Sequence, residues 1–531
     1  MLIEIVVERG AARVFHRRLK ERFERDFPAA KLALRAAASG APAPAAIGAL
    51  LAIERLTYLK SRETFCDRLP EADIETSVAA TPDMIIDFSS IDSRPLPSVL
   101  TLRPLFDGVG SEAALIGALL DGRAPQISIE NVSTGEIVGM GVPSLETAGS
   151  LTEGMEAVYS RLIPLVIKAA RDPQHSIARR LANPCEPSAA RAARYAVRNL
   201  GARAARALYH WLCYAPHWRV GWRFNDGPGV MELGDLSGPK WNVLPDSGRR
   251  CYADPFAVTW QGRSCLFFED LDHRVGKGVI SFIEFGPDGP VGEAVPVIEE
   301  PWHLSYPFLI EAEGSLWMIP ESSLSGAVPL YRCVEFPRRW ERCATLLEGI
   351  EAADATVFAH RGRYYMTSVV REGVGGYSDT LAIHHAPSLL GPWRAHAAQP
   401  ALIDVSAARP AGSVVERSGA LWRPVQDCAR GYGRALRLAR IDRIDPENFA
   451  QTLTARIESG PQWPGGRLHT LNRAGRLECI DGVAITPKSR MLRQFANARF
   501  QPVAGGQSAA PTPADALASL VSRDQAVEEL S

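Results

Sequence analysis

Several common signals are missing from this sequence of 531 residues. Its nine cysteines are odd in number and form no CxxC pair, which argues against a disulfide framework and against a cysteine zinc site. No run of about 20 apolar residues is present, so no transmembrane helix is expected. The first apolar run comes before the basic residues, whereas a secretory signal peptide has them in the opposite order. These absences predict a location in the reducing cytoplasm.

The sequence also has no excess of charge of either sign, because 59 Lys and Arg residues are balanced by 60 Asp and Glu residues. Such a chain has no overall attraction to nucleic acid, so no nucleic-acid partner is expected. Walker, HExxH, GxSxG and GxGxxG motifs are absent, and we predict neither a metal site nor a cofactor. The length exceeds that of one hydrophobic core and predicts two to four domains of about 150 residues.

Residues 1–170 alternate short apolar runs with helical stretches. LIEIVV and MIIDFSS (84–90) are typical of buried strands, residues 11–27 of an amphipathic helix, and AALIGALLDG (113–122) of a helix that ends at Gly122. A hairpin is expected around Gly135. This alternation predicts an α/β domain with an open sheet.

Residues 171–239 are predicted to form a basic helical linker. Between Ser188 and Asn225 there are seven arginines and no acidic residue, and tyrosines and tryptophans follow the alanine-rich part. One interpretation is a linker helix that packs on its neighbours. The alternative is an interfacial helix that lies on an anionic membrane surface, which would make the protein peripheral to a membrane.

Residues 240–490 contain an internal repeat in which an apolar run, a turn with glycine and an aromatic-rich run follow one another. Five such units are present, and their turn glycines are Gly262, Gly314, Gly362, Gly419 and Gly475. The spacing of 48 to 57 residues fits one four-stranded sheet per unit. The repeat therefore predicts an all-β five-bladed β-propeller. Residues 491–531 are rich in small residues and predict a mostly disordered tail.

Polar residues stand at the ends of the expected inner strands. The strand openings carry Asp254, Tyr306, Asp354, Arg409 and His469, and the second strands end at Glu269, Asp270, Glu321, Gln426, Asp427 and Asp481. Acids gathered around one axis shift one another's pKa values and suit sugar chemistry, in which one carboxylate acts as base and another donates a proton. Turn-closing aspartates and a core histidine are the structural alternatives for single members.

Further candidates flank these strands. Lys277 lies between two glycines in EDLDHRVGKG, a segment that suits either close approach to a ligand or a plain polar hairpin. The residues that we assign to substrate binding are Glu269, Asp270, Lys277, His303, Tyr306, Arg409, Gln426, Asp427, His469 and Asp481.

Long motifs within residues 240–490 carry a family resemblance. FFEDLDHRVGKGVI, HLSYPFLIEAEGSLWMIPESS, ADATVFAHRGRYYMTS and ARPAGSVVERSGALWRPVQDCARGYG resemble the propeller of glucosamine inositolphosphorylceramide transferases and their bacterial relatives. That propeller is similar to those of family 43 and family 32 glycoside hydrolases. The resemblance implies that Asp254 is a base or nucleophile, that Asp354 tunes pKa values, and that Glu321 is a candidate acid. The second blade opens with SYP rather than with an acid, so the hydrolase pattern is incomplete.

Residues 99–138 resemble the N-terminal domain of methionyl-tRNA formyltransferase-like proteins. That family needs an Asn, a His and an Asp, but this chain has no histidine between His16 and His175. We therefore expect a formyltransferase-like fold without formyl-transfer activity.

Together these patterns predict a protein of glycoconjugate assembly. Its propeller is expected to bind a sugar, a nucleotide-sugar or a glycolipid in an axial funnel, most simply for glycosyl transfer. A carbohydrate-binding scaffold without chemistry and a glycoside hydrolase are the two alternatives.

Overall fold

The computed structural model describes residues 1–37, 44–59, 62–70, 73–74, 81–89, 98–174, 176–178, 183–371, 373–463 and 465–493. Two compact units divide the chain near Ala202, within the long helix α5 (Ala189–Leu212). Most of the expected tail at 491–531 lies outside the described residues. Among the described residues, no helix has the length and apolar character needed to cross a bilayer.

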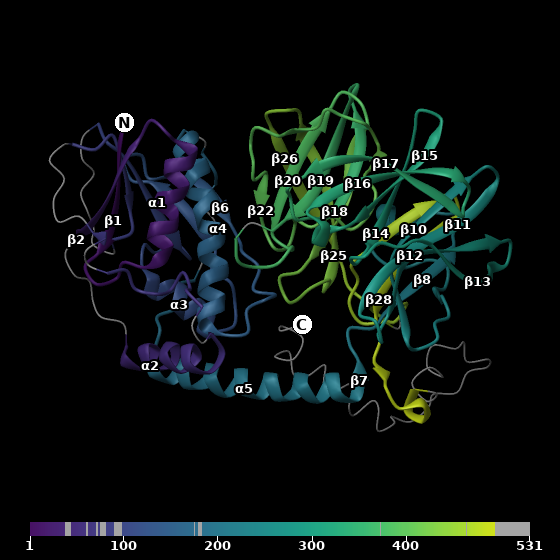
Figure 1. Cartoon of the computed structure of the whole chain (residues 1–531), viewed down its shortest axis with the longest axis horizontal. Coiled ribbons are helices and arrows are strands. Elements are labelled where there is room, and N and C mark those ends of the chain that lie inside the picture. Colours follow the sequence, from purple (N-terminus) through teal and green to yellow (C-terminus); the bar gives the residue numbers. More distant parts are fainter. Residues whose placement is uncertain are drawn as a thin grey trace. The chain divides into compact units, whose positions relative to one another are not determined.

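The first unit is a mixed sheet with helices (Figure 1). Its strand order is β2-β1-β3-β4-β5-β6, in which the first four strands run parallel and the last two antiparallel. The strands are β1 (Leu2–Glu8), β2 (Lys31–Ala37), β3 (Met84–Asp87), β4 (Leu100–Phe106), β5 (Ile127–Asn131) and β6 (Glu136–Gly141). The helices are α1 (Val14–Asp26), α2 (Ala45–Glu54), α3 (Glu112–Leu120), α4 (Leu151–Arg171) and the start of α5, and a π-helical turn covers Arg55–Leu59.

These elements confirm an α/β unit, and the hairpin turn at Gly135 has the positive φ of 72° that favours glycine. The last residue of the expected strand 84–90 lies outside the described residues. The formyltransferase-like identity of the unit stays a prediction.

The second unit is a five-bladed β-propeller, as the repeat predicts (Figure 1). Blade 1 comprises β10 (Arg250–Trp260), β11 (Arg263–Asp272), β12 (Lys277–Gly286) and β13 (Gly289–Ile298), and blade 2 comprises β14 (Ser305–Ala312), β15 (Ser315–Glu321), β16 (Ala327–Glu335) and β17 (Arg339–Glu348). Blade 3 comprises β18 (Ala352–His360), β19 (Arg363–Val370), β20 (Thr380–Ala386), β21 (Arg394–Ala395) and β22 (Leu402–Ile403), and blade 4 comprises β23 (Val415–Arg417), β24 (Ala420–Asp427), β25 (Ala435–Ile444) and β26 (Phe449–Ile457).

Blade 5 is built from both ends of the propeller sequence. Strand β27 (Leu471–Ala474) pairs with β28 (Leu477–Val483), β28 pairs with β8 (Trp218–Phe224), and β8 pairs with β9 (Asn242–Val243). The short strands β7 (Cys213–Tyr214) and β29 (Thr486–Pro487) form a further pair, and the helical turn α6 (Val230–Leu233) lies between β8 and β9. The structure thus corrects the expected linker at 171–239, because β8 belongs to the propeller.

Each blade begins with a tight hairpin at the glycine that the repeat marks. Gly262, Gly314, Gly362, Gly419 and Gly475 all have φ between 56° and 74°. In blades 1 to 4 the residue before this glycine also has a positive φ of 50–52°, as a type I′ turn requires.

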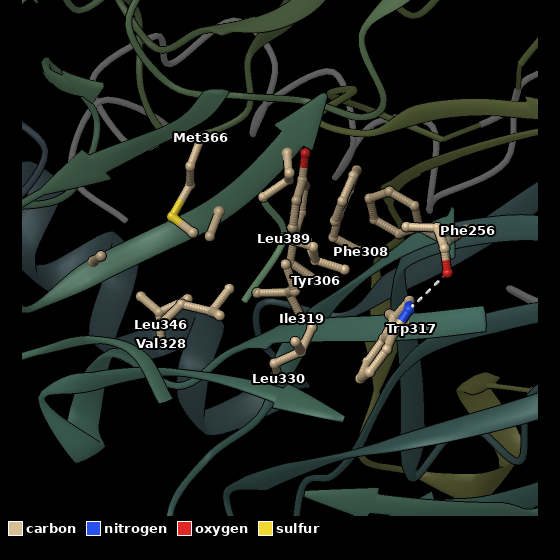
Figure 2. Close-up of a cluster of buried hydrophobic side chains, with 14 residues drawn as sticks. Phe256, Tyr306, Phe308, Trp317, Ile319, Val328, Leu330, Leu346, Met366 and Leu389 are labelled. Atoms are coloured by element: carbon tan, nitrogen blue, oxygen red, sulfur yellow. Dashed lines mark hydrogen bonds between the residues drawn. The ribbon is translucent and has the colours of Figure 1, made fainter. Parts of the chain in front are cut away.

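Between neighbouring blades the core is apolar. Figure 2 shows one such cluster, which contains Phe256 of blade 1, Tyr306 and Phe308 of blade 2 and Met366 of blade 3. The Tyr306 ring stands edge-on to Phe256 at 4.8 Å between centroids. This packing fixes the inner strands β10, β14 and β18, which carry the candidate site.

Candidate functional site

Three successive inner strands share a β-bulge. Asp254 in β10, Tyr306 in β14 and Asp354 in β18 are the first residues of these bulges, and their φ angles are 51°, 41° and 54°. A non-glycine residue in this region costs roughly 1–3 kcal/mol, and such strain collects at functional sites. The bulge re-aims one side chain per blade at an equivalent position.

The strand pairing also shows which second-strand residues are equivalent. Glu269 lies opposite the residue before the bulge in blade 1, and Glu321 does so in blade 2. Val369 has that place in blade 3. Blades 1 and 2 therefore each supply one glutamate at the same height, beside the bulged residue.

Asp254 lies in a buried network that blade 5 completes. Its carboxylate accepts hydrogen bonds from the Thr470 hydroxyl at 2.7 Å and from the Tyr306 backbone N–H at 3.3 Å. His469 Nε2 lies 3.6 Å from Asp254 Oδ1, and His469 Nδ1 lies 2.6 Å from Asp481 Oδ2. Asp481 also accepts bonds from three backbone N–H groups, so it orients the imidazole.

Asp354 is held by Arg409 from blade 4. Arg409 Nε donates to Asp354 Oδ2 at 2.6 Å, and Gln426 Nε2 donates to the same oxygen at 3.1 Å. Arg409 Nη2 also lies 3.9 Å from Glu321 Oε2. One guanidinium therefore connects acids from blades 2 and 3.

The two glutamates have different hydrogen-bond partners. Glu321 accepts bonds from the hydroxyls of Ser305 at 3.1 Å and Ser323 at 3.0 Å. Glu269 Oε1 lies 3.3 Å from His303 Nε2. Since His303 Nδ1 accepts a bond from the Gly278 N–H at 2.9 Å, the proton of this imidazole belongs on Nε2, which donates to Glu269.

The side chains of the site differ in how far they are exposed to solvent. The side chains of His303, Glu321 and Glu269 are 30%, 13% and 12% exposed. Asp254, Asp354 and His469 are buried. A ligand that enters from solvent thus meets the glutamates before the aspartates.

Burial and crowding shift the pKa values of these groups. The pKa of Glu269 is well above its usual range because of burial and because of the carboxylates of Asp254 and Glu321. Burial also raises the pKa of Asp354, although Arg409 opposes this, and it raises that of Asp254 against the effect of His469. Burial lowers the pKa of His469, but the carboxylates of Asp481 and Asp254 outweigh it and raise the pKa overall.

Two aromatic residues that are not among the predicted binding residues complete the site. Trp218 stacks on His469 with ring centroids 3.8 Å apart and an angle of 4°. Tyr432 meets His469 edge-on at 5.4 Å, and the Arg409 guanidinium lies 4.7 Å from its ring centroid. Tyr432 lies between two glycines, both of which have a positive φ, and this glycine pair is the sequence feature that marks its loop. Trp218 lies in the segment that is predicted to be a linker.

Four of the predicted binding residues lie in other surroundings. Asp270 points away from Glu269, and its carboxylate accepts hydrogen bonds from Arg250 Nε at 2.7 Å and Arg250 Nη2 at 2.9 Å. Asp427 likewise accepts bonds from Arg437 and Arg456.

Lys277 and Tyr306 are also placed differently. Lys277 pairs with Glu299 at 2.9 Å. The Tyr306 hydroxyl is buried, where it meets the Thr356 hydroxyl and accepts a bond from the Gly412 N–H, each at 2.8 Å. The structure thus gives structural contacts to these four residues, because adjacent strand residues face opposite sides and because the Tyr306 ring enters the core.

Asp254, His469 and Asp481 could each offer one ligand atom to a metal ion, within 4.8 Å of one another. His469 Nδ1 and Asp481 are, however, already hydrogen-bond partners. The arrangement fits an imidazole held between two carboxylates.

Comparisons with known proteins cover the propeller. Residues 246–485 match the family model of Glucosamine inositolphosphorylceramide transferase 1, N-terminal. Glucosamine inositolphosphorylceramide transferase 1 of Arabidopsis thaliana is 30% identical over 248 residues, which are 44% of this chain and 32% of the plant protein. Its counterpart in Oryza sativa subsp. indica is 29% identical over 230 residues, 41% of this chain and 31% of that protein. The chain thus spans about a third of the length of these relatives.

Among solved structures, a thermostable family-43 glycoside hydrolase aligns with 14% identity and a TM-score of 0.31, over 43% of this chain and 86% of the hydrolase. The family match confirms the resemblance that the repeat motifs carry. The propeller is therefore similar to the N-terminal region of glucosamine inositolphosphorylceramide transferase 1 proteins.

Proposed function

We propose that the propeller binds a sugar at the cluster formed by Asp254, Glu269, Glu321, Asp354 and Arg409, hereafter the acidic cup, and that it takes part in glycosyl transfer. The observation that carries this proposal is the convergence of four acids from three successive blades around one arginine and one histidine. Carboxylates accept hydrogen bonds from sugar hydroxyls, and pairs with separated pKa values serve as acid and base.

The charge balance of the cup favours an amino sugar over a phosphate. Arg409 is already bonded to Asp354 and lies close to Glu321, so its charge is compensated within the protein. The other acids of the cup outnumber its cations, and their carboxylates repel one another. The ammonium group of an amino sugar would attract these carboxylates. The names of the curated relatives include glucosamine, which is consistent with this preference.

The surroundings assign different proton roles to the acids. Glu269 keeps its proton to a higher pH than an ordinary glutamate, so it suits proton donation to a leaving oxygen. Glu321 accepts hydrogen bonds from two serine hydroxyls and lies near Arg409. We therefore propose Glu269 as the acid in place of Glu321, with Asp254 as the base.

A binding role without chemistry is the second candidate. It is favoured by the burial of Asp254 and Asp354 and by the hydrogen bonds that both already accept from the protein.

Calorimetric titration of the full chain with glucosamine and with N-acetylglucosamine tests the proposed ligand. The two sugars share a ring and differ in the charge at one nitrogen. We expect glucosamine to bind at least tenfold more tightly, and excess inorganic phosphate not to compete. Equal affinity for both sugars, or displacement by phosphate, would contradict the amino-sugar preference.

A further inference from the structure

Helix α5 is basic from Arg191 to Arg206. Its 24 residues, AARAARYAVRNLGARAARALYHWL, contain five arginines and no acidic residue. At 1.5 Å per residue the helix is about 36 Å long. Such a helix is long enough to offer an extended surface to a partner.

The apolar side of α5 faces solvent. Val197, Leu200, Leu208 and Trp211 are 74%, 66%, 53% and 72% exposed. With Ala204 they follow the spacing of three and four residues that places side chains on one helix face. The buried residues of the helix are alanines, Ala192 and Ala202. A helix of a globular protein normally buries its large apolar residues, so this polarity is inverted.

Arginines flank the apolar face on both sides. At 100° per residue, Arg194 and Arg198 lie about 60° and 100° from Val197 on one side, and Arg203 lies about 120° away on the other. Arg191 and Arg198 bond to Asp121, through its side chain and its carbonyl oxygen respectively. The arginine flanks and the exposed apolar face together make an amphipathic surface, hereafter the α5 face.

We propose that the α5 face binds the surface of an anionic phospholipid bilayer, with the helix lying in the plane of the membrane. Exposed leucine and tryptophan side chains enter the boundary between headgroups and acyl chains, while flanking arginines meet lipid phosphates. The helix lies on the membrane and does not cross it, since its arginines recur from Arg191 to Arg206.

A second copy of this chain fits the α5 face less well than a lipid surface. Pairing of two such helices would bury the apolar stripe, but it would also bring arginines of both copies together without an acid on either helix. Like charges beside a helix seam oppose association. Anionic lipid carries the opposite charge, and α5 has no acidic residue of its own.

Cosedimentation of the full chain with vesicles tests this inference. The probes are vesicles of phosphatidylcholine alone and of phosphatidylcholine with 30% phosphatidylglycerol. We expect at least tenfold tighter binding to the anionic vesicles, weakened by high salt. We expect at least tenfold weaker binding for the fourfold variant Val197→Ser/Leu200→Ser/Leu208→Ser/Trp211→Ser. The variant Arg194→Ser/Arg203→Ser should lose about fivefold in affinity for each arginine that is replaced.

A matched control replaces exposed apolar residues of the propeller. Val275 and Leu324 are 68% and 74% exposed, and Val275→Ser/Leu324→Ser should bind vesicles like the unmodified protein. Circular dichroism checks that each variant keeps its thermal midpoint. Equal binding to both kinds of vesicle, no binding, or an equal loss in the control would overturn the proposal. A dimer in sedimentation without lipid, lost in the fourfold serine variant, would assign the face to self-association instead.

Discussion

At the scale of the residue, the acids of the cup are distinguished by their neighbours. Glu269 and Asp270 are adjacent in the sequence, yet one meets His303 at the cup and the other is clamped by Arg250. Composition and position predict that acids gather at strand ends. Which acid of a pair faces the cup depends on strand register and on the bulge, which the sequence does not display.

Stability should depend on pH through Glu269. Its raised pKa means that the folded state keeps a proton that the unfolded state loses above about pH 4.5, so stability falls as the pH rises from there through the folded pKa. Glu269→Gln removes this penalty and should raise the thermal midpoint at pH 7–8, by about 2–4 °C per kcal/mol relieved. The gain should shrink as the pH falls toward 4.5.

Glu284→Gln provides the control in scanning calorimetry across pH 4–8. Glu284 pairs with Arg263 at a half-buried position, and this pair lowers the pKa of Glu284. Its replacement should change stability by less than about 1 kcal/mol, in the destabilising direction at neutral pH. A Glu269→Gln midpoint below that of the unmodified protein at pH 8 would refute the protonated state of Glu269.

At the scale of the element, the hairpins follow from the sequence and the bulges do not. The five turn glycines sit in a repeat of tight turns, and each was found with a positive φ. The bulges place Asp254, Tyr306 and Asp354 in the same strained conformation, although only aspartate favours it. Tyr306 adopts this conformation because its ring packs in the core between blades. Its hydroxyl accepts a hydrogen bond from the backbone of blade 4.

Tyr306→Phe should therefore destabilise the propeller. The change leaves the buried Gly412 N–H without its acceptor at 2.8 Å, which costs about 1–3 kcal/mol. Urea denaturation measures this loss. Tyr331→Phe, which removes a bond to Glu300 near the surface, should cost clearly less. Equal effects of the two substitutions would show that the Tyr306 hydroxyl does not hold blade 4.

At the scale of the whole molecule, the closure of the propeller was the feature hardest to foresee. The repeat marks five hairpins between residues 240 and 490, but blade 5 takes β8 from residues 218–224. Strand pairing over such a sequence distance leaves no local pattern. The same closure brings Trp218 onto His469, so both β8 and this aromatic residue of the site lie in the segment that was predicted to be a linker.

A fragment of residues 240–490 should consequently fail to fold. It lacks β8, exposes the edge of β28 and loses Val220 and Trp222 from the core between blades 5 and 1. Residues 203–493 retain the strand and should unfold cooperatively. Size-exclusion chromatography and thermal unfolding of both fragments measure this. A monomeric, cooperatively folded 240–490 fragment would contradict the role of β8.

The most direct test of the acidic cup as the sugar site is a measurement of affinity for glucosamine. It compares the full chain with Asp254→Asn and uses Asp270→Asn as the control. Asp254→Asn removes a charge from the cup, so affinity should fall by about 5- to 150-fold, the equivalent of 1–3 kcal/mol, with little change in thermal midpoint. Asp270→Asn breaks the pair with Arg250 and should lower the midpoint while affinity stays within about twofold. Unchanged affinity in Asp254→Asn, or an equal loss in both variants, would contradict the assignment of the sugar site to this cup.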